Sequence, residues 1–438
     1  MRIPVESYRL PNGLHVVLSE DHTAPIVAVN LWYHVGSANE RLERTGFAHL
    51  FEHMLFQGSE QVQANEHFEL VQRAGGTLNG STWLDRTNYY ETLPSNQLAI
   101  ALWLEADRMG RYLPGLTQDK LDTQRDVVKN ERRWSVDNQP YGTWWEKLPA
   151  LCFPEGHPFN HSLIGSMEHL SDAALDDVAE FFRTYYTPDN AVLTVAGDLD
   201  RDEAMRLIAE YFGPIAPGGA RPPLRDMSVP PTFGATLREV VEDAVALPRL
   251  FVAHRTPVFG SDGYYAASLA AAVLGLRTGC RLEQSLVRRQ RVASSVSAFT
   301  YDLAKGSDLL VVDATAHNDV SAEQLEAAVI AELDLLHRDG VTESEVARAR
   351  ALIETSFVMS LQSAAERADQ LSRFATYFGD ANLANEQVAR YQAVSAEDVS
   401  RLVRERLGPE NRALLVYVPS AADETTSVAT TDATAVAS

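Results

Sequence analysis

Residues 45–56 have the sequence TGFAHLFEHMLF, in which two histidines lie four positions apart. If this stretch is helical, His49 and His53 lie one above the other on the same face. Two imidazoles in that arrangement can bind one metal ion. Glu52 lies three residues after His49 and next to His53, close enough to hold a water molecule bound to the metal. The stretch therefore predicts a metal site on a helix.

A third ligand has to come from elsewhere, because a catalytic zinc ion usually has three protein ligands and one open position. Residues 119–134 have apolar residues at helical spacing, and Glu131 lies in a polar run among them. A zinc ion held by two histidines and one glutamate can lower the pKa of its water and polarise a carbonyl group. Two alternatives stay open: Glu131 is an ordinary surface glutamate, or Glu105 in the expected helix 98–112 is the ligand.

Several segments of the chain match a known family. The order His-x-x-Glu-His at 49–53 is the inverse of the common zinc-protease motif. Four further segments match the family: GGTLNGST at 75–82, NERR at 130–133, DNQPYG at 137–142 and GHPF at 156–159. On these residues the chain resembles the pitrilysin/insulinase family of inverted (HxxEH) zinc metallopeptidases. Within it, the chain is most similar to bacterial zinc-bearing members and to beta-type subunits of the mitochondrial processing peptidase.

The resemblance implies a complete metal site. It implies one zinc ion per chain bound by His49, His53 and Glu131, with Glu52 as the base that takes a proton from the zinc-activated water. The family often has a second glutamate two helical turns before the third ligand, where this chain has Gln124. An amide can orient a ligand by hydrogen bonding but carries no charge. We expect zinc to be retained, with Gln124 as an outer partner that tunes its affinity.

An internal duplication divides the chain into two similar halves. Residues 177–195 align with 398–416 without a gap at an offset of 221, and each copy has the pattern of a helix, a Pro-Asx turn and a buried strand. At that offset the metal-site residues of the first half correspond to Ala270, Val273 and Leu274. The second half is therefore expected to keep the helix without the metal ligands.

The expected fold class is α+β, with two homologous α/β-sandwich halves that, by the resemblance, close round a chamber. The predicted organisation is a zinc-bearing half at 1–215, a Pro- and Gly-rich linker at 216–238, a degenerate half at 239–420, and a disordered tail at 421–438. Apolar patterns predict strands at 14–19, 26–35, 87–93, 249–255, 295–301 and 309–316. Helical patterns predict helices at 98–112, 264–274, 322–338, 343–360 and 365–378.

Residues 77–82 form a short polar segment that is typical of a strand at the edge of a sheet. Such an edge can pair with an extended peptide, so Asn79 and Gly80 are candidate substrate-binding residues; the alternative is a simple β-turn. The resemblance adds an arginine and a tyrosine of the second half that hold the substrate carbonyl. Arg281 matches the arginine, whereas Ser294 stands where the tyrosine is expected. We therefore predict a dimer, with a related non-zinc subunit that supplies the Arg/Tyr pair as the favoured partner.

The composition excludes several classes of protein. The chain has 60 acidic and 38 basic residues, and the resulting net charge of −22 argues against nucleic acid as a partner. No stretch approaches 18 uninterrupted apolar residues, so no membrane segment is expected. Two cysteines, Cys152 and Cys280, are too few for a disulfide framework, and the first residues lack an apolar leader segment. These features predict a cytoplasmic location.

The sequence thus predicts a zinc metallopeptidase, an endopeptidase or oligopeptidase that hydrolyses flexible peptides with a zinc-activated water. One alternative is a non-catalytic peptide-binding or assembly subunit of a heterodimeric peptidase, against which the retained metal residues argue. A second alternative is a metal-dependent hydrolase of a non-peptide substrate.

Overall fold

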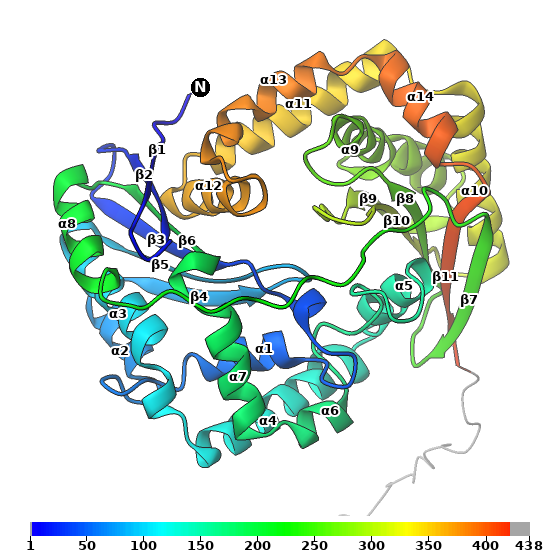
Figure 1. Ribbon diagram of the computed structural model, residues 1–438. Coiled ribbons are helices and arrows are strands. Elements are labelled where there is room, and N and C mark those ends of the chain that lie inside the picture. The colour runs from blue at the N-terminus through cyan, green and yellow to red at the C-terminus, as the bar shows by residue number, and fades with distance from the viewer. Residues whose placement is uncertain (1, 421–438) are drawn as a thin grey trace, which may run out of the picture.

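Two β-sheets organise the chain, one in each half (Figure 1). The computed structural model describes residues 2–420, so the tail that the sequence predicts to be disordered, 421–438, lies outside the described residues. Among these residues, none of the helices combines the length and the apolar character needed to cross a membrane.

The first sheet has six strands in the order β1-β2-β6-β3-β5-β4. Their bounds are β1 (Glu6–Arg9), β2 (His15–Glu20), β3 (Ile26–Tyr33), β4 (Thr77–Thr82), β5 (Thr87–Pro94) and β6 (Ala191–Gly197). Only the β2–β6 pair is parallel. The segment predicted as an edge strand is β4, which pairs with β5 alone and ends the sheet, so the alternative of a simple turn is wrong.

The helices of the first half are α1 (Phe47–Met54), α2 (Glu66–Arg73), α3 (Leu98–Arg111), α4 (Gln118–Arg132), α5 (Trp144–Cys152), α6 (Met167–Asp172), α7 (Leu175–Tyr185) and α8 (Arg201–Phe212). Helices α1, α3, α4, α7 and α8 share one apolar core with the sheet. Val16 and Leu18 of β2 point into this core, while Val17 between them points to the other face. Because both faces are covered, β2 is buried from His15 to Ser19, and its three central residues are apolar on both faces.

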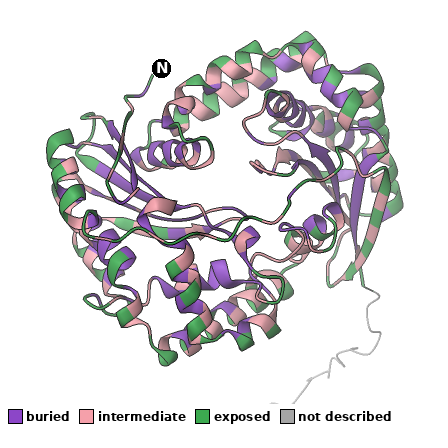
Figure 2. Cartoon of the chain, in the orientation of Figure 1, coloured by how far each residue is buried: buried purple, intermediate pink, exposed green. Residues whose placement is uncertain are grey.

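The second half repeats this plan with five strands in the order β7-β11-β8-β10-β9. The strands are β7 (Ala235–Asp243), β8 (Arg249–Thr256), β9 (Ala293–Thr300), β10 (Asp308–Ala316) and β11 (Asn411–Pro419). The helices are α9 (Asp262–Gly275), α10 (Ala322–Asp339), α11 (Glu343–Ser360), α12 (Ala364–Phe378), α13 (Gln387–Ala393) and α14 (Ala396–Arg406). Helices α9, α10 and α14 form the core on one face of this sheet. Almost every residue of α9 from Tyr264 to Gly275 is buried (Figure 2).

The structure bears out the duplication at the predicted offset. Adding 221 to the bounds of α7, 175–185, gives 396–406, which are the bounds of α14. The same operation on α1 gives 268–275, inside α9. The α+β fold class with two similar halves is therefore confirmed.

The two halves exchange one helix, which the sequence did not predict. Adding 221 to the bounds of α5 gives 365–373, inside α12, so these helices are duplicates of each other. Helix α5 stacks Trp144 on Phe251 of the second sheet, with ring centroids 4.6 Å apart, and its Leu148 lies in the same apolar cluster. Helix α12 packs Leu371 against Trp32 in the first sheet, whose other face it covers (Figure 1). Each half therefore contributes apolar surface to the core of the other, which joins the halves by hydrophobic burial.

The stretch between the halves differs slightly from the prediction. Residues 213–234 contain no helix or strand, and β7 begins at Ala235, so the last four residues of the predicted linker belong to a strand. The sequence reading missed both β1 and β7. Both are outermost strands with exposed residues, and their patterns are less apolar than those of the central strands.

One buried histidine of the second sheet gives a prediction about stability. His254 on β8 is fully buried, and neither ring nitrogen has a hydrogen-bond partner within residues 2–420. Burial lowers the pKa of His254 from 6.5 to about 3. Below pH 6.5 the unfolded chain therefore binds a proton that the folded chain does not, and stability falls as the pH decreases toward 3. This group alone contributes a slope of about 1.4 kcal/mol per pH unit.

We expect the His254→Leu variant to lose stability less steeply than the unsubstituted chain when the pH is lowered from 6.5 to 4.5. Urea unfolding at several pH values measures the free energy of unfolding directly. Equal slopes for both proteins would contradict the prediction.

Candidate metal centre and active site

Helices α1 and α4 bring the three predicted ligands together. His49 and His53 lie one turn apart on α1, with their ring centroids 4.8 Å apart. Glu131 near the end of α4 faces both rings: its Oε1 is 3.6 Å from His49 Nε2, and its Oε2 is 3.1 Å from His53 Nε2. One ligand atom from each residue lies within 4.8 Å of the other two. The structure thus brings Glu131, from a distant part of the chain, next to both histidines, in a group that could hold a metal ion.

The donor set and its protonation fit zinc. Bonds of about 2.0–2.2 Å to a tetrahedral zinc ion place ligand atoms about 3.3 Å apart. The distances from the Glu131 oxygens to His53 Nε2 and His49 Nε2, 3.1 and 3.6 Å, lie on either side of this value. Burial lowers the pKa of His49 to about 4, so its imidazole is neutral at neutral pH, as a ligand must be. Burial raises the pKa of Glu131, but the hydrogen bond to His53 and the charges of His49 and His53 together outweigh burial and leave the pKa lowered. Two imidazoles and one carboxylate, with the carboxylate charged, are the residues that a catalytic zinc ion uses.

Glu52 lies between this cluster and strand β4. Its Oε2 accepts a hydrogen bond of 2.5 Å from the Thr82 hydroxyl, on the last residue of β4. Burial raises the pKa of Glu52, which makes the carboxylate a better proton acceptor than an exposed glutamate. Glu52 is thus next to the three candidate ligands and beside the free edge of the first sheet.

Two family descriptions match most of the chain. The family description "Insulinase (Peptidase family M16)" matches residues 15–155, and the description "Peptidase M16 inactive domain" matches residues 172–353. The chain belongs to peptidase family M16, the insulinase family. The first match contains His49, Glu52, His53 and Glu131.

Proteins of similar sequence align with most of this M16 chain. The zinc protease PqqE of Helicobacter pylori is 29% identical over 363 residues, covering 82% of this chain and 81% of its own. A probable beta subunit of the mitochondrial-processing peptidase of Arabidopsis thaliana is 24% identical, with 94% and 77% covered. The crystal structure of a Helicobacter pylori protease superposes with a TM-score of 0.89 at 26% identity, with 96% and 100% covered. The relatives thus carry the names of peptidases, and the fold is that of M16 peptidases.

The second half lacks a metal site at the corresponding position. Ala270, Val273 and Leu274 of α9 are all buried in the apolar core of that half. This arrangement agrees with the match to a domain described as inactive.

Gln124 lies where the sequence places an outer partner of the site. It is buried on α4, two turns before Glu131, and its side chain is among the groups that raise the pKa of His53. The largest single influence on the His53 pKa is burial, which lowers it, but the hydrogen bond with Glu131, the charges of Glu131 and Glu52, and Gln124 together raise the pKa. The position of Gln124 is thus suited to orienting the His53 ring.

Arg281 and Ser294 make their polar contacts away from the cluster. The Arg281 guanidinium donates two hydrogen bonds to the Glu345 carboxylate, at 2.5 and 2.8 Å, and one to the Gly340 carbonyl. Ser294 on β9 is exposed, and its hydroxyl donates to the Thr315 carbonyl. The structure therefore brings together the predicted metal-site residues of the first half. It does not bring Arg281 of the second half to them.

Glu105, the alternative third ligand, belongs to a different cluster. It is fully buried on α3 together with His67 and Glu91, and the three offer ligand atoms within 4.8 Å of one another. Arg108, also buried, pairs with Glu105 and lies 4.0 Å from the centroid of the Tyr89 ring. Because this guanidinium supplies positive charge, the cluster has a counter-ion without a metal.

The candidate substrate-binding residues lie at the edge strand. Asn79 is exposed, and its side-chain oxygen accepts from the Gly80 amide. Gly80 is buried against Glu52: a Cβ atom there would lie 3.1 Å from Glu52 Cγ, 3.2 Å from its Oε1 and 3.2 Å from Phe56 Cε2. The sequence reading did not assign a role to Thr82, although it lies in the matched segment 75–82.

We expect Gly80→Ala to lower kcat for peptide hydrolysis by about 10-fold or more, because the new methyl group displaces the Glu52 carboxylate. The zinc content should stay unchanged, since the methyl group meets none of the three ligands. Gly219→Ala is the matched control, because an added Cβ atom there has nothing within 4 Å and the residue has no positive φ. A Gly80→Ala protein with unchanged kcat would contradict the prediction.

Proposed function

We propose that this chain is a zinc-dependent endopeptidase or oligopeptidase that hydrolyses flexible peptides. The observation that carries the proposal is the convergence of His49, His53 and Glu131 beside Glu52 and the free edge of β4. Metal ligands, a base and a peptide-pairing edge in one place are the parts that peptide hydrolysis requires.

Each part has a separate chemical role. His49, His53 and Glu131 would hold one zinc ion, which when bound lowers the pKa of a water molecule and polarises a carbonyl group. Glu52 takes the proton from the attacking water and passes it to the leaving amine. The Thr82 hydroxyl fixes the orientation of the Glu52 carboxylate from β4.

The free edge of β4 gives the preference for flexible peptides. One side of β4 pairs with β5, and its other side has backbone groups available to an added strand. A peptide must be extended to pair there, so a folded protein is a poor substrate. Gly80 leaves Glu52 close to that edge. The proposed role of Arg281 requires its guanidinium to release Glu345.

We also propose that the chain works as a dimer with a related non-zinc subunit. Ser294 in place of a tyrosine supports this, because its short hydroxyl side chain binds the Thr315 carbonyl. A similar protein from Arabidopsis thaliana is named as one subunit of the mitochondrial-processing peptidase. The two cysteines are free and buried, in keeping with a reducing, cytoplasmic location.

Two other functions fit less well. A non-catalytic peptide-binding or assembly subunit has no use for a complete set of ligands and a base. A hydrolase of non-peptide substrates would leave the free edge of β4 without a role.

Hydrolysis of an unstructured peptide by the purified chain, with zinc measured on the same sample, tests the proposal. One zinc ion per chain and cleavage that a chelator abolishes would support it and show that no partner is needed. One zinc ion without cleavage would point to the missing subunit, and co-purification then identifies it. A chain with neither zinc nor cleavage would overturn the enzyme assignment.

A further inference from the structure

Helix α1, which carries both histidines and the base, has no capping side chain at its own N-terminus. Its first amides are preceded by Gly46, which has a left-handed backbone conformation with φ of 89°. Three other helices of this half begin with a side-chain cap, supplied by Thr117 in α4, Ser166 in α6 and Asp200 in α8, whereas α2, α3, α5 and α7 have no such cap either. The unpaired amides at the start of a helix need acceptors when they are buried. The acceptor for α1 therefore has to come from outside the helix.

Glu40 supplies that acceptor. Its Oε2 accepts from the Gly46 amide at 2.9 Å, and its Oε1 accepts from the Ala48 amide at 2.7 Å. Ala48 directly precedes His49. Both oxygens of one side chain thus fix the first turn of the catalytic helix.

Glu40 is buried, so its carboxyl group depends on these hydrogen bonds. Glu40 is only 3% exposed, and burial raises its pKa to about 8, while the backbone amides of α1 act in the opposite direction. A buried carboxylate is costly unless its oxygens accept hydrogen bonds. The Arg225 side chain does not pair with this carboxylate; it donates to the backbone carbonyl of Glu40 at 2.6 Å.

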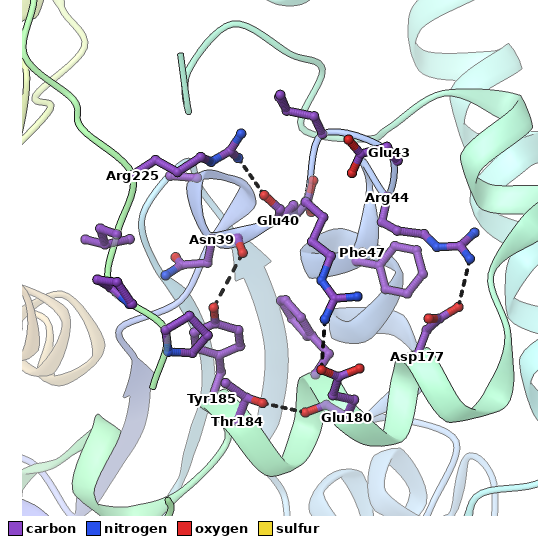
Figure 3. A pocket seen from close by; sticks show the side chains of 17 residues that line it. Asn39, Glu40, Glu43, Arg44, Phe47, Asp177, Glu180, Thr184, Tyr185 and Arg225 are labelled. Atoms are coloured by element: carbon purple, nitrogen blue, oxygen red, sulfur yellow. Dashed lines mark hydrogen bonds and ion pairs between the residues drawn. The ribbon is translucent and has the colours of Figure 1, made fainter. Parts of the chain in front are cut away.

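Arg225 connects Glu40 to the segment between the two halves. It lies within residues 213–234, which run from α8 to β7. Figure 3 shows Arg225 reaching from this segment to Glu40 across one side of a pocket that Phe47 and Tyr185 also line. The start of α1 is held on another side as well, because a Cβ atom on Gly46 would lie 2.6 Å from the Ile164 carbonyl oxygen. The catalytic helix is therefore fixed at its N-terminus by three segments of the chain.

We propose that Glu40 is a positioning residue for catalysis: it sets the position of α1, and hence of His49, Glu52 and His53, and Arg225 holds it in place from the inter-half segment. The proposal rests on the proposed peptidase function for its effect on turnover. Its effect on the metal site follows from the hydrogen bonds to Gly46 and Ala48 alone.

Glu40→Gln is the main variant, because glutamine has the same size but only one acceptor oxygen. Its amide nitrogen would face one of the two α1 amides, donor against donor. Glu43→Gln is the matched control, since Glu43 lies on the same loop, lines the same pocket and is exposed. Arg225→Met is a milder second variant that removes the bond to the Glu40 carbonyl and leaves the carboxylate intact.

Four readouts are made on the full chain. We expect Glu40→Gln to lower kcat by about 10- to 100-fold with KM unchanged, and to weaken zinc binding in a chelator competition by about 10-fold or more. The absorption spectrum of the cobalt-substituted chain should shift, and hydrogen exchange of residues 44–55 should become faster. Glu43→Gln should equal the unsubstituted chain in every readout. Arg225→Met should change the same quantities as Glu40→Gln in the same direction, but by smaller amounts.

Each outcome decides the proposal. Unchanged zinc affinity, cobalt spectrum and exchange in Glu40→Gln would overturn it. Arg225→Met equal to the unsubstituted chain would overturn the part assigned to Arg225. If Glu40→Gln fails to fold, the Arg225→Met variant decides. Faster hydrogen exchange over residues 44–55 in Arg225→Met would support the proposal, and unchanged exchange would refute it. Zinc binding and hydrogen exchange can be measured without peptide hydrolysis. A chain that cleaves no peptide would therefore refute the proposed function, while these two measurements would still test the positioning role of Glu40.

Discussion

Glu52→Gln is expected to keep one zinc ion per chain and to hydrolyse an unstructured peptide about 10²- to 10⁴-fold more slowly than the unsubstituted chain. Glutamine has the size of glutamate and can accept the hydrogen bond that Thr82 donates, but it cannot take a proton from water. The expected loss corresponds to about 3 to 5 kcal/mol of transition-state stabilisation. Peptide hydrolysis and zinc content, measured on the same sample, check the expected loss of rate and the expected retention of zinc.

A matched control separates the loss of the base from the loss of a negative charge. Glu43→Gln removes the same charge from an exposed position on the loop before α1 and should have the full activity. Thr82→Val, which removes the hydroxyl that orients the carboxylate, should give an intermediate rate. A Glu52→Gln protein with undiminished hydrolysis would rule out Glu52 as the base, and one without zinc would mean that Glu52 is needed for the metal site itself.

Local patterns in the sequence were sufficient for the part of the site that lies on one helix. The spacing of His49, Glu52 and His53 has one geometric meaning on a helix, and the structure has that helix as α1. Glu131 was predicted from a family motif and not from spacing, since 78 residues separate it from His53. The offset of 221 predicted the second half well, because α7 and α14 have equivalent bounds.

The remaining features depend on contacts that the sequence does not display. The exchange of α5 and α12 follows from which sheet each helix covers, and an amphipathic pattern is the same on either sheet. Glu40 caps α1 from six residues before Gly46, and a cap is normally read only at the residue next to the helix. Arg281 pairs with Glu345 through a fold contact between distant segments. Such long-range pairs are set by topology and not by local propensity.

Glu131→Gln tests the residue whose place in the site depends most on tertiary structure. We expect its zinc dissociation constant to rise by about 100-fold or more, because loss of an outer partner of a zinc site already costs about 10- to 100-fold. Hydrolysis at limiting zinc should fall with it, and excess zinc should restore part of the activity. Chelator competition measures the affinity without turnover. The matched control is Asp126→Asn, an exposed charge on the same helix, which should leave the affinity unchanged.

The two variants together distinguish a ligand from a base. Glu52→Gln should lose rate at constant zinc affinity, and Glu131→Gln should lose zinc affinity first and rate as a consequence. The geometry requires this difference, because Glu131 contacts both histidines while Glu52 hydrogen-bonds to β4. If Glu131→Gln bound zinc as tightly as the unsubstituted chain, the third ligand would have to be another residue. Within residues 2–420, however, the only other cluster of this kind, which contains Glu105, shares no residue with the His49–His53 pair. An unchanged affinity would therefore refute the three-ligand site as a whole and not only the role of Glu131.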